Sequence, residues 1–82
     1  MTREEIRAAV LAALGELAPE ADLEALAPGA ELRETLDLDS MDFLRFLQML
    51  AEATGVEVPE TDYSKLNTLS GCVEYLSVQG TR

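Results

Sequence analysis

The segment from Ser40 to about Thr54 constrains the fold more than any other part of the chain. Its apolar residues are too many for one face of a helix: Met41, Phe43, Leu44, Phe46, Leu47, Met49 and Leu50. Gly55 follows the segment as a natural C-terminal cap. A helix this apolar either lies at the centre of a bundle or leaves part of its surface exposed for a partner. Within it, we expect Leu44 to be buried and Met41 to be exposed.

The first half of the chain indicates one more amphipathic helix and a long connection. Thr2 and Glu5 have the spacing of a capping box, and apolar residues recur at helical spacing until Pro19 ends the pattern. From residue 18 to residue 39 the periodic signal weakens, although leucines recur and residues 22–26 could form a single helical turn. Loops longer than about 12–15 residues are uncommon in compact domains unless they are functional or disordered. The leucines favour an ordered loop that crosses between the two helices.

The last third of the chain indicates two shorter helices and a tail. Pro59 opens a brief helix that ends near Leu66, and Asn67 or Thr68 caps a final helix. Residues 77–82 are expected to form a flexible tail. The predicted fold class is all-α: a small four-helix bundle of three main helices and a short third helix, with a long loop between helices one and two. We expect the 82 residues to form a single domain.

Charge and composition exclude several classes of function. The chain has 16 acidic residues against 6 basic ones and a net charge of −10, which disfavours nucleic acid as a partner because phosphate backbones bind Lys and Arg. The charge favours solubility and partners with basic surfaces. No segment is long and apolar enough to span a membrane, and the N-terminus lacks the pattern of a signal peptide. The single cysteine excludes an internal disulfide, so we expect a cytoplasmic protein.

The residue types of common catalytic and metal sites are also missing. The chain has no histidine, which removes Ser-His-Asp catalysis and histidine-dependent metal sites. Cys72 lies on an apolar helix face, so it is expected to be a small core residue. The acids after Leu36 suggest a calcium-binding loop, but Asp42 stands where that loop needs Gly and Gln48 where it needs Glu. We therefore expect neither a metal site nor an enzyme.

Ser40 stands at the start of the apolar helix, beside Asp37, Asp39 and Asp42. At a helix start, unpaired backbone N–H groups and the positive end of the helix dipole stabilise an anion by about 0.3–1 kcal/mol. A phosphodiester on Ser40 would therefore be stable there. The alternative is that Ser40 is only the N-cap, a role worth about 1 kcal/mol. Asp39 could take that role instead and leave the Ser40 hydroxyl free.

Several segments together resemble the acyl carrier protein family. Asp39-Ser40-Met41 stands in the place of the family's Asp-Ser-Leu triplet, which opens its second helix. Gly55-Val56-Glu57-Val58-Pro59 is similar to the family's Gly-Val-Glu-Ile-Pro segment, and residues 66–69 and 73–76 resemble its closing helix. The resemblance covers nearly the whole chain and is strongest from Leu36 to Leu76.

The resemblance implies a carrier rather than an enzyme. A phosphopantetheinyl transferase would attach 4′-phosphopantetheine from coenzyme A to Ser40, with Asp39 serving in recognition by the transferase and as the helix cap. The terminal thiol would hold acyl intermediates as thioesters for enzymes of fatty acid, polyketide or specialised lipid synthesis. The carrier would be a monomer. The enzymes that load and process the acyl group would use basic patches on their own surfaces to dock on it.

Two sets of residues follow from the same resemblance. Those expected to contact partner enzymes are Asp37, Met41, Asp42, Arg45, Gln48, Glu52 and Glu60. Those expected to line an acyl pocket between helices two, three and four are Leu47, Leu50, Val58, Tyr63, Leu66 and Cys72. The acids could equally form a solvated face, and the pocket residues are also ordinary core positions.

The chain departs from the family's usual pattern in several places. Asp37, Met41 and Arg45 stand where the family often has Gly, Leu and Glu, and Tyr63 replaces a small residue. These departures indicate a specialised carrier with its own partners, and Met1 directly before a helix cap favours a free-standing protein. Two alternatives stay open. One is a peptidyl or aryl carrier of non-ribosomal synthesis, which the acidity disfavours, and the other is an unmodified adaptor that docks through the same acidic helix.

Overall fold

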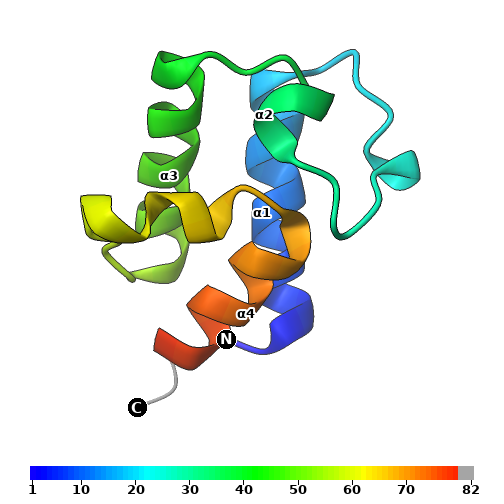
Figure 1. Cartoon of the computed structure of the whole chain (residues 1–82). Coiled ribbons are helices and arrows are strands. Elements are labelled where there is room, and N and C mark those ends of the chain that lie inside the picture. Colours follow the sequence, from blue (N-terminus) through cyan, green and yellow to red (C-terminus); the bar gives the residue numbers. More distant parts are fainter. Residues whose placement is uncertain (80–82) are drawn as a thin grey trace.

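The computed structural model describes residues 1–79, and all regular structure within them is helical (Figure 1). The elements in chain order are α1 (Arg3–Leu17), the 3₁₀ turn η1 (Leu23–Ala25), the one-turn helix α2 (Leu32–Thr35), α3 (Ser40–Thr54), the 3₁₀ helix η2 (Glu60–Leu66) and α4 (Leu69–Gln79). α1 runs antiparallel to α3 and packs against both α3 and α4. The predicted all-α bundle is confirmed, and its short third helix is η2.

Helix α1 begins with the predicted capping box. The Thr2 hydroxyl accepts the backbone N–H of Glu5 at 3.1 Å, and the Glu5 carboxylate accepts the backbone N–H of Thr2 at 2.8 Å. These contacts satisfy N–H groups that have no partner within the first helical turn. The apolar face of α1, with Ile6, Val10 and Leu14, is buried in the common core.

Helix α3 lies at the centre of the bundle and also exposes part of its apolar surface. Both of the alternatives that its composition suggested are therefore correct. Its core residues are Phe43, Phe46, Leu47 and Leu50. Met41 is 74% exposed, as expected, whereas the prediction that Leu44 is buried is wrong, because this side chain is 37% exposed. Leu44 lines two surface grooves beside α3. Gly55 ends the helix in the left-handed conformation, with φ of +75°, and its N–H donates to the Ala51 carbonyl at 2.8 Å.

The connection between α1 and α3 is ordered, as its leucines predicted. Leu32 and Leu38 are buried, and η1 forms the single turn expected near residues 22–26. Two backbone hydrogen bonds tie the connection to the segment that opens α4. The Leu32 N–H donates to the Asn67 carbonyl at 2.8 Å, and the Ser70 N–H donates to the Pro28 carbonyl at 3.0 Å. The sequence pattern does not reveal α2, because its 4 residues are too few to show a period.

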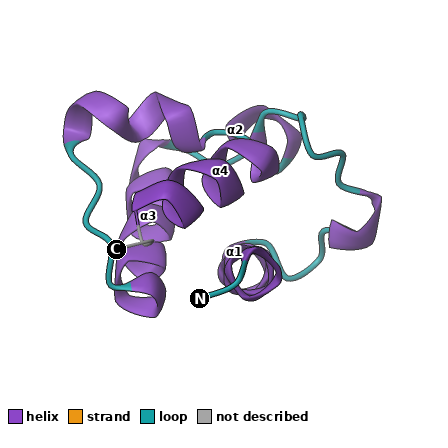
Figure 2. Cartoon of the chain, turned by 90° about the horizontal axis from the view of Figure 1, so that it is seen from below, coloured by secondary structure: helices purple, strands orange, loops and turns teal. Residues whose placement is uncertain are grey.

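Helix α4 packs across the bundle near the start of α1 (Figure 2). Residues 77–79, expected in a flexible tail, instead continue α4, and residues 80–82 lie outside the described part of the chain. The last turn is held in place because Leu76 is buried and the Ser77 hydroxyl accepts a hydrogen bond from Arg3 Nη1 at 3.1 Å. None of the helices in residues 1–79 combines the length and apolar character needed to cross a membrane.

Candidate functional site

Ser40 is the first residue of α3, and its side chain is not used to cap the helix. Asp39 is the N-cap, since its carboxylate accepts the backbone N–H of Asp42 at 2.8 Å. The Asp42 carboxylate accepts the Asp39 N–H in return, at 3.3 Å. The alternative in which Ser40 is the N-cap is therefore wrong. Ser40 is exposed, and its hydroxyl is available at the positive end of the α3 dipole.

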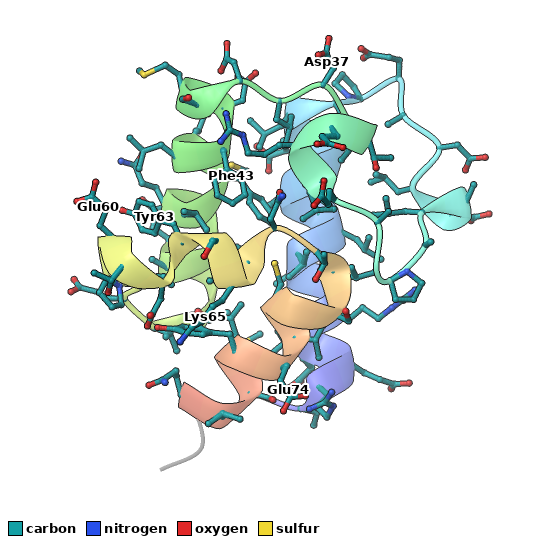
Figure 3. The ribbon with its side chains drawn as sticks, in the orientation of Figure 1. Asp37, Phe43, Glu60, Tyr63, Lys65 and Glu74 are labelled. Carbon is teal, nitrogen blue, oxygen red and sulfur yellow. The ribbon has the colours of Figure 1, made fainter. Side chains whose placement is uncertain are left out.

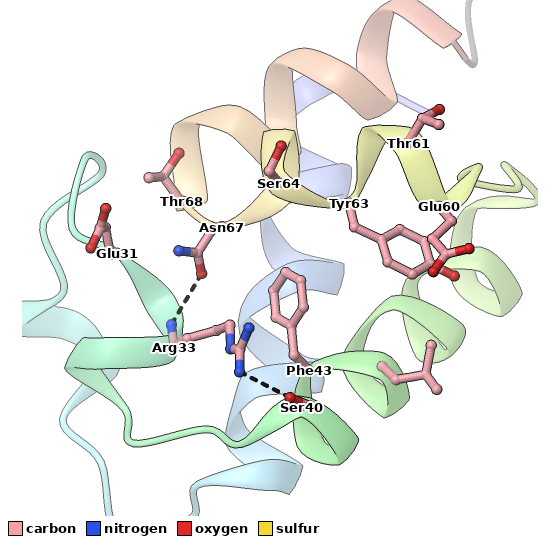
Figure 4. A pocket seen from close by; sticks show the side chains of 11 residues that line it. Glu31, Arg33, Ser40, Phe43, Glu60, Thr61, Tyr63, Ser64, Asn67 and Thr68 are labelled. Atoms are coloured by element: carbon pink, nitrogen blue, oxygen red, sulfur yellow. Dashed lines mark hydrogen bonds between the residues drawn. The ribbon is translucent and has the colours of Figure 1, made fainter.

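A cation from α2 contacts this hydroxyl. Arg33 Nη2 donates to Ser40 Oγ at 3.2 Å, and the guanidinium carbon lies 5.7 Å from the centre of the Phe43 ring (Figure 4). Asn67 holds the start of α2, because its side-chain oxygen accepts the Arg33 N–H at 3.1 Å and its carbonyl accepts the Leu32 N–H. Sequence reasoning missed Arg33, since no local pattern links a one-turn helix to the serine that follows it.

A groove of about 920 Å³ opens beside Ser40, between α2, α3 and η2. Phe43 and Tyr63 face it from opposite sides in Figure 4. Its lining is mixed, with apolar, hydroxyl and charged side chains: Glu31, Arg33, Ser40, Phe43, Leu44, Glu60, Thr61, Tyr63, Ser64, Asn67 and Thr68. The Ser40 hydroxyl thus borders enough open space to accept a bulky substituent.

The six residues expected to line an acyl pocket are divided between two grooves and the buried core. Tyr63 borders the large groove, and it joins Leu47 and Val58 at a second, smaller groove of about 180 Å³. The other three, Leu50, Leu66 and Cys72, are fully buried and line neither groove. They fill the interior with their own side chains, and the Cys72 thiol donates to the Leu66 carbonyl at 3.2 Å.

Cys72 is the core residue that the sequence predicted. Burial raises the pKa of its thiol to about 12, so the thiol stays protonated at neutral pH. A protonated thiol is neither a good nucleophile nor a metal ligand. The lone cysteine of this chain therefore serves packing rather than chemistry.

The residues expected to contact partner enzymes are all at or near the surface, around α3. Met41, Arg45, Gln48 and Glu52 recur every three or four residues, which places them on one exposed stripe of the helix. Figure 3 shows Asp37 in the turn before α3 and Glu60 at the start of η2, beside the helix. Asp42 is half-buried, and its carboxylate takes part in the capping box. Within residues 1–79, no three acidic or cysteine side chains form a group that could hold a metal ion.

Asp37 has the backbone conformation that glycine favours. Its φ is +57°, in the left-handed region that side chains other than Gly, Asn and Asp rarely adopt. This geometry explains the turn that links α2 to α3. Next to it, the Leu38 N–H donates to the Arg33 carbonyl at 2.9 Å, which closes the chain back onto α2.

Comparison with known proteins is consistent with this geometry. Residues 4–76 match the family described as "Phosphopantetheine attachment site". The chain is 34% identical over 55 residues to an acyl carrier protein of Rubrobacter xylanophilus, a match that covers 67% of this chain and 68% of that protein. It is 33% identical over 55 residues to an acyl carrier protein of Lactobacillus johnsonii, covering 67% and 69% of the two chains. A third acyl carrier protein, of Thermosynechococcus vestitus, is 32% identical over 56 residues, covering 68% and 69%. The chain therefore belongs to the acyl carrier protein family and contains its phosphopantetheine attachment domain.

Proposed function

We propose that this chain is an acyl carrier protein, not an enzyme, and that 4′-phosphopantetheine is attached to Ser40. The observation that supports this most is the position of Ser40 in the attachment domain. Its hydroxyl is exposed at the first residue of a long helix whose cap is another side chain. It also borders a groove of about 920 Å³.

The residues around Ser40 fit a phosphodiester. The N-terminus of α3 and the Arg33 guanidinium both supply positive potential at the Ser40 oxygen. When attached, the group supplies a thiol that holds an acyl chain as a thioester, while the protein supplies attachment and recognition. In the attachment reaction, Ser40 Oγ forms a bond to the phosphorus next to pantetheine in coenzyme A. The diphosphate bond breaks, 3′,5′-adenosine bisphosphate leaves, and the hydroxyl proton passes to a base of the magnesium-dependent transferase.

Partner enzymes with basic surfaces are proposed to dock on the exposed stripe of α3 and the acids near it. The net charge of −10 favours fast encounter with such surfaces. Met41, at 74% exposure, supplies an apolar contact within the stripe, and Arg45 gives it a cation that would select among partners. We propose a cytoplasmic, monomeric carrier for fatty acid, polyketide or specialised lipid synthesis.

The proposal is tested by intact mass before and after incubation with coenzyme A, magnesium and a broad-specificity phosphopantetheinyl transferase. Wild type and Ser64→Ala should each gain one phosphopantetheinyl group, whereas Ser40→Ala should gain none. Ser64 is the matched control because it is an exposed serine on the same groove. Circular dichroism would verify that each variant is folded.

A folded wild type that gains no mass would refute the attachment. The adaptor alternative would then be the better one, because Met41 and Leu44 remain exposed on α3 without any modification.

A further inference from the structure

We propose that Arg33 binds the phosphodiester formed on Ser40 and directs the start of the attached arm into the groove between α2, α3 and η2. This inference rests on the proposed attachment at Ser40. It assigns to Arg33 a positioning role that the family match does not specify.

The first argument is the contact itself. Arg33 Nη2 already donates to Ser40 Oγ at 3.2 Å, and this oxygen becomes the ester oxygen after modification. The other phosphate oxygens are bonded to the same phosphorus atom, so they lie within reach of the same guanidinium. Arginine presents five N–H donors in a planar fork that matches phosphate, and such charge-assisted hydrogen bonds are about twice as strong as neutral ones.

The second argument is that the guanidinium is not engaged in an ion pair with a carboxylate of the described residues. Although the chain has 16 acidic residues, no carboxylate among residues 1–79 forms an ion pair with Arg33. The ion pairs present there join Arg3 to Glu74 and Lys65 to Asp62. Arg7 and Arg45 also form no ion pair among these residues, but Arg33 is the one of the three that contacts Ser40, so its charge is available to an anion formed there.

The third argument is preorganisation. Asn67 accepts the Arg33 N–H, and the Arg33 carbonyl accepts the Leu38 N–H at 2.9 Å, so the backbone of Arg33 is held at both ends. Its guanidinium lies over the Phe43 ring at 5.7 Å, within the range of a cation–π contact. The residue therefore loses less conformational entropy on binding phosphate than a free surface arginine would.

The direction of the arm follows from where the charges lie. Arg33 and Ser40 both line the large groove, and Figure 4 shows Arg33 and Phe43 together on the groove side of Ser40. The carboxylates of Asp39 and Asp42 form the capping box at the same helix start and repel a phosphate. The phosphodiester is therefore expected on the Arg33 side, which places the first atoms of the arm at the mouth of the groove.

The test compares the apo and modified forms of wild type, Arg33→Gln, Arg33→Lys and Arg7→Gln. Arg7→Gln is the matched control because it removes the same charge from an exposed site on α1. Intact mass first establishes that each protein is modified. For each protein, the Tm of the apo form is subtracted from the Tm of the modified form. This difference should be about 4–8 °C higher in wild type than in Arg33→Gln, which is the shift expected when a domain of this size loses the contact between arginine and phosphate. Arg33→Lys should retain part of the difference, and Arg7→Gln all of it.

If modification changed the Tm of Arg33→Gln by as much as it changes the Tm of wild type, the proposal would be overturned. An arginine with only a structural role stabilises the apo and modified forms equally. Nuclear magnetic resonance of modified wild type tests the geometry without a variant. The Arg33 side-chain N–H signals should shift on modification, and the first methylene and the methyl groups of the arm should show contacts with the Phe43 ring. Unchanged Arg33 signals, or contacts with Met41 alone, would refute it. If wild type gains no mass, the attachment itself fails, an outcome that is distinct from both of these.

Discussion

The Asp39 carboxylate accepts the backbone N–H of Asp42 at 2.8 Å, and this contact caps helix α3. It releases the neighbouring serine from a role that serines often have at this position. The acidic stretch around Ser40 thus has a structural use at Asp39 and Asp42, besides the negative surface that it gives to the start of the helix.

Replacing Asp39 should therefore cost stability in a way that depends on the capping oxygen. Asp39→Ala should lower the free energy of unfolding by about 1 kcal/mol, whereas Asp39→Asn should keep most of it, because the amide oxygen also accepts the Asp42 N–H. Urea unfolding followed by circular dichroism measures both. Equal stabilities for the two variants would show that the cap contributes little.

The turn before α3 should be more stable with glycine. Since Asp37 has a φ of +57°, Asp37→Gly should unfold at a higher urea concentration than wild type and Asp37→Ala at a lower one. The two variants should differ by about 1 kcal/mol. Asp37→Asn should lie close to wild type, because Asn tolerates this conformation as Asp does. If Ala proved as stable as Gly, the turn would not have this conformation in solution.

Gly71, in the first turn of α4, lies close to the backbone of η2. A Cβ atom there would clash with the Lys65 carbonyl oxygen and lie 2.8 Å from Thr68 Oγ1. Gly71→Ala should therefore destabilise the protein by about 1–3 kcal/mol from overpacking, which outweighs the helix propensity gained from Ala. Gly29→Ala is the control, since a Cβ atom there meets nothing within 4 Å. Thermal unfolding of the two variants side by side decides the matter, and a neutral Gly71→Ala would contradict the packing described.

The contact between η2 and α4 should also depend on pH. Tyr75 Oη donates to Asp62 Oδ2 at 2.7 Å, and this hydrogen bond, with a smaller contribution from Lys65 at 3.3 Å, lowers the pKa of the Asp62 carboxyl below its ordinary value of 3.8. A carboxyl whose pKa is lowered by folding stabilises the protein above its unfolded pKa. The stabilisation is lost as the pH falls through the folded pKa.

The Tm difference between wild type and Asp62→Asn should therefore be largest near neutral pH and vanish in strong acid. The same hydrogen bond raises the pKa of the Tyr75 hydroxyl. Its contribution to stability is therefore fully present below the pKa of an unfolded tyrosine, and it is lost as the pH rises through the pKa of Tyr75 in the folded protein. Tyr75→Phe should show a reduced Tm at neutral pH. A wild-type-minus-variant difference that stayed constant with pH would contradict this assignment for both residues.

The sequence by itself was sufficient for the main helices and for the candidate attachment residue. Capping boxes, helical spacing and a glycine C-cap are local signals, because each depends on residues within one or two turns of the same helix. Thr2 and Glu5 at α1, and Gly55 at the end of α3, were therefore predictable. The expected ends failed where long-range contacts decided them, as at Ser77, whose hydroxyl accepts a hydrogen bond from Arg3 at the opposite end of the chain.

The surroundings of Ser40 were decided only by the tertiary structure. Helix α2 is too short to be stable alone, and it forms because Asn67, 34 positions further along the chain, accepts the N–H of Arg33. With α2 held in this place, Arg33 donates to Ser40 and lines the groove beside Phe43. The burial of Leu50, Leu66 and Cys72, which a helical pattern cannot distinguish from the lining of a pocket, depends in the same way on how η2 packs against α4. Local chemistry determined where α1 and α3 begin and where α3 ends, whereas contacts between distant residues determined how far α4 extends and what lies beside the serine.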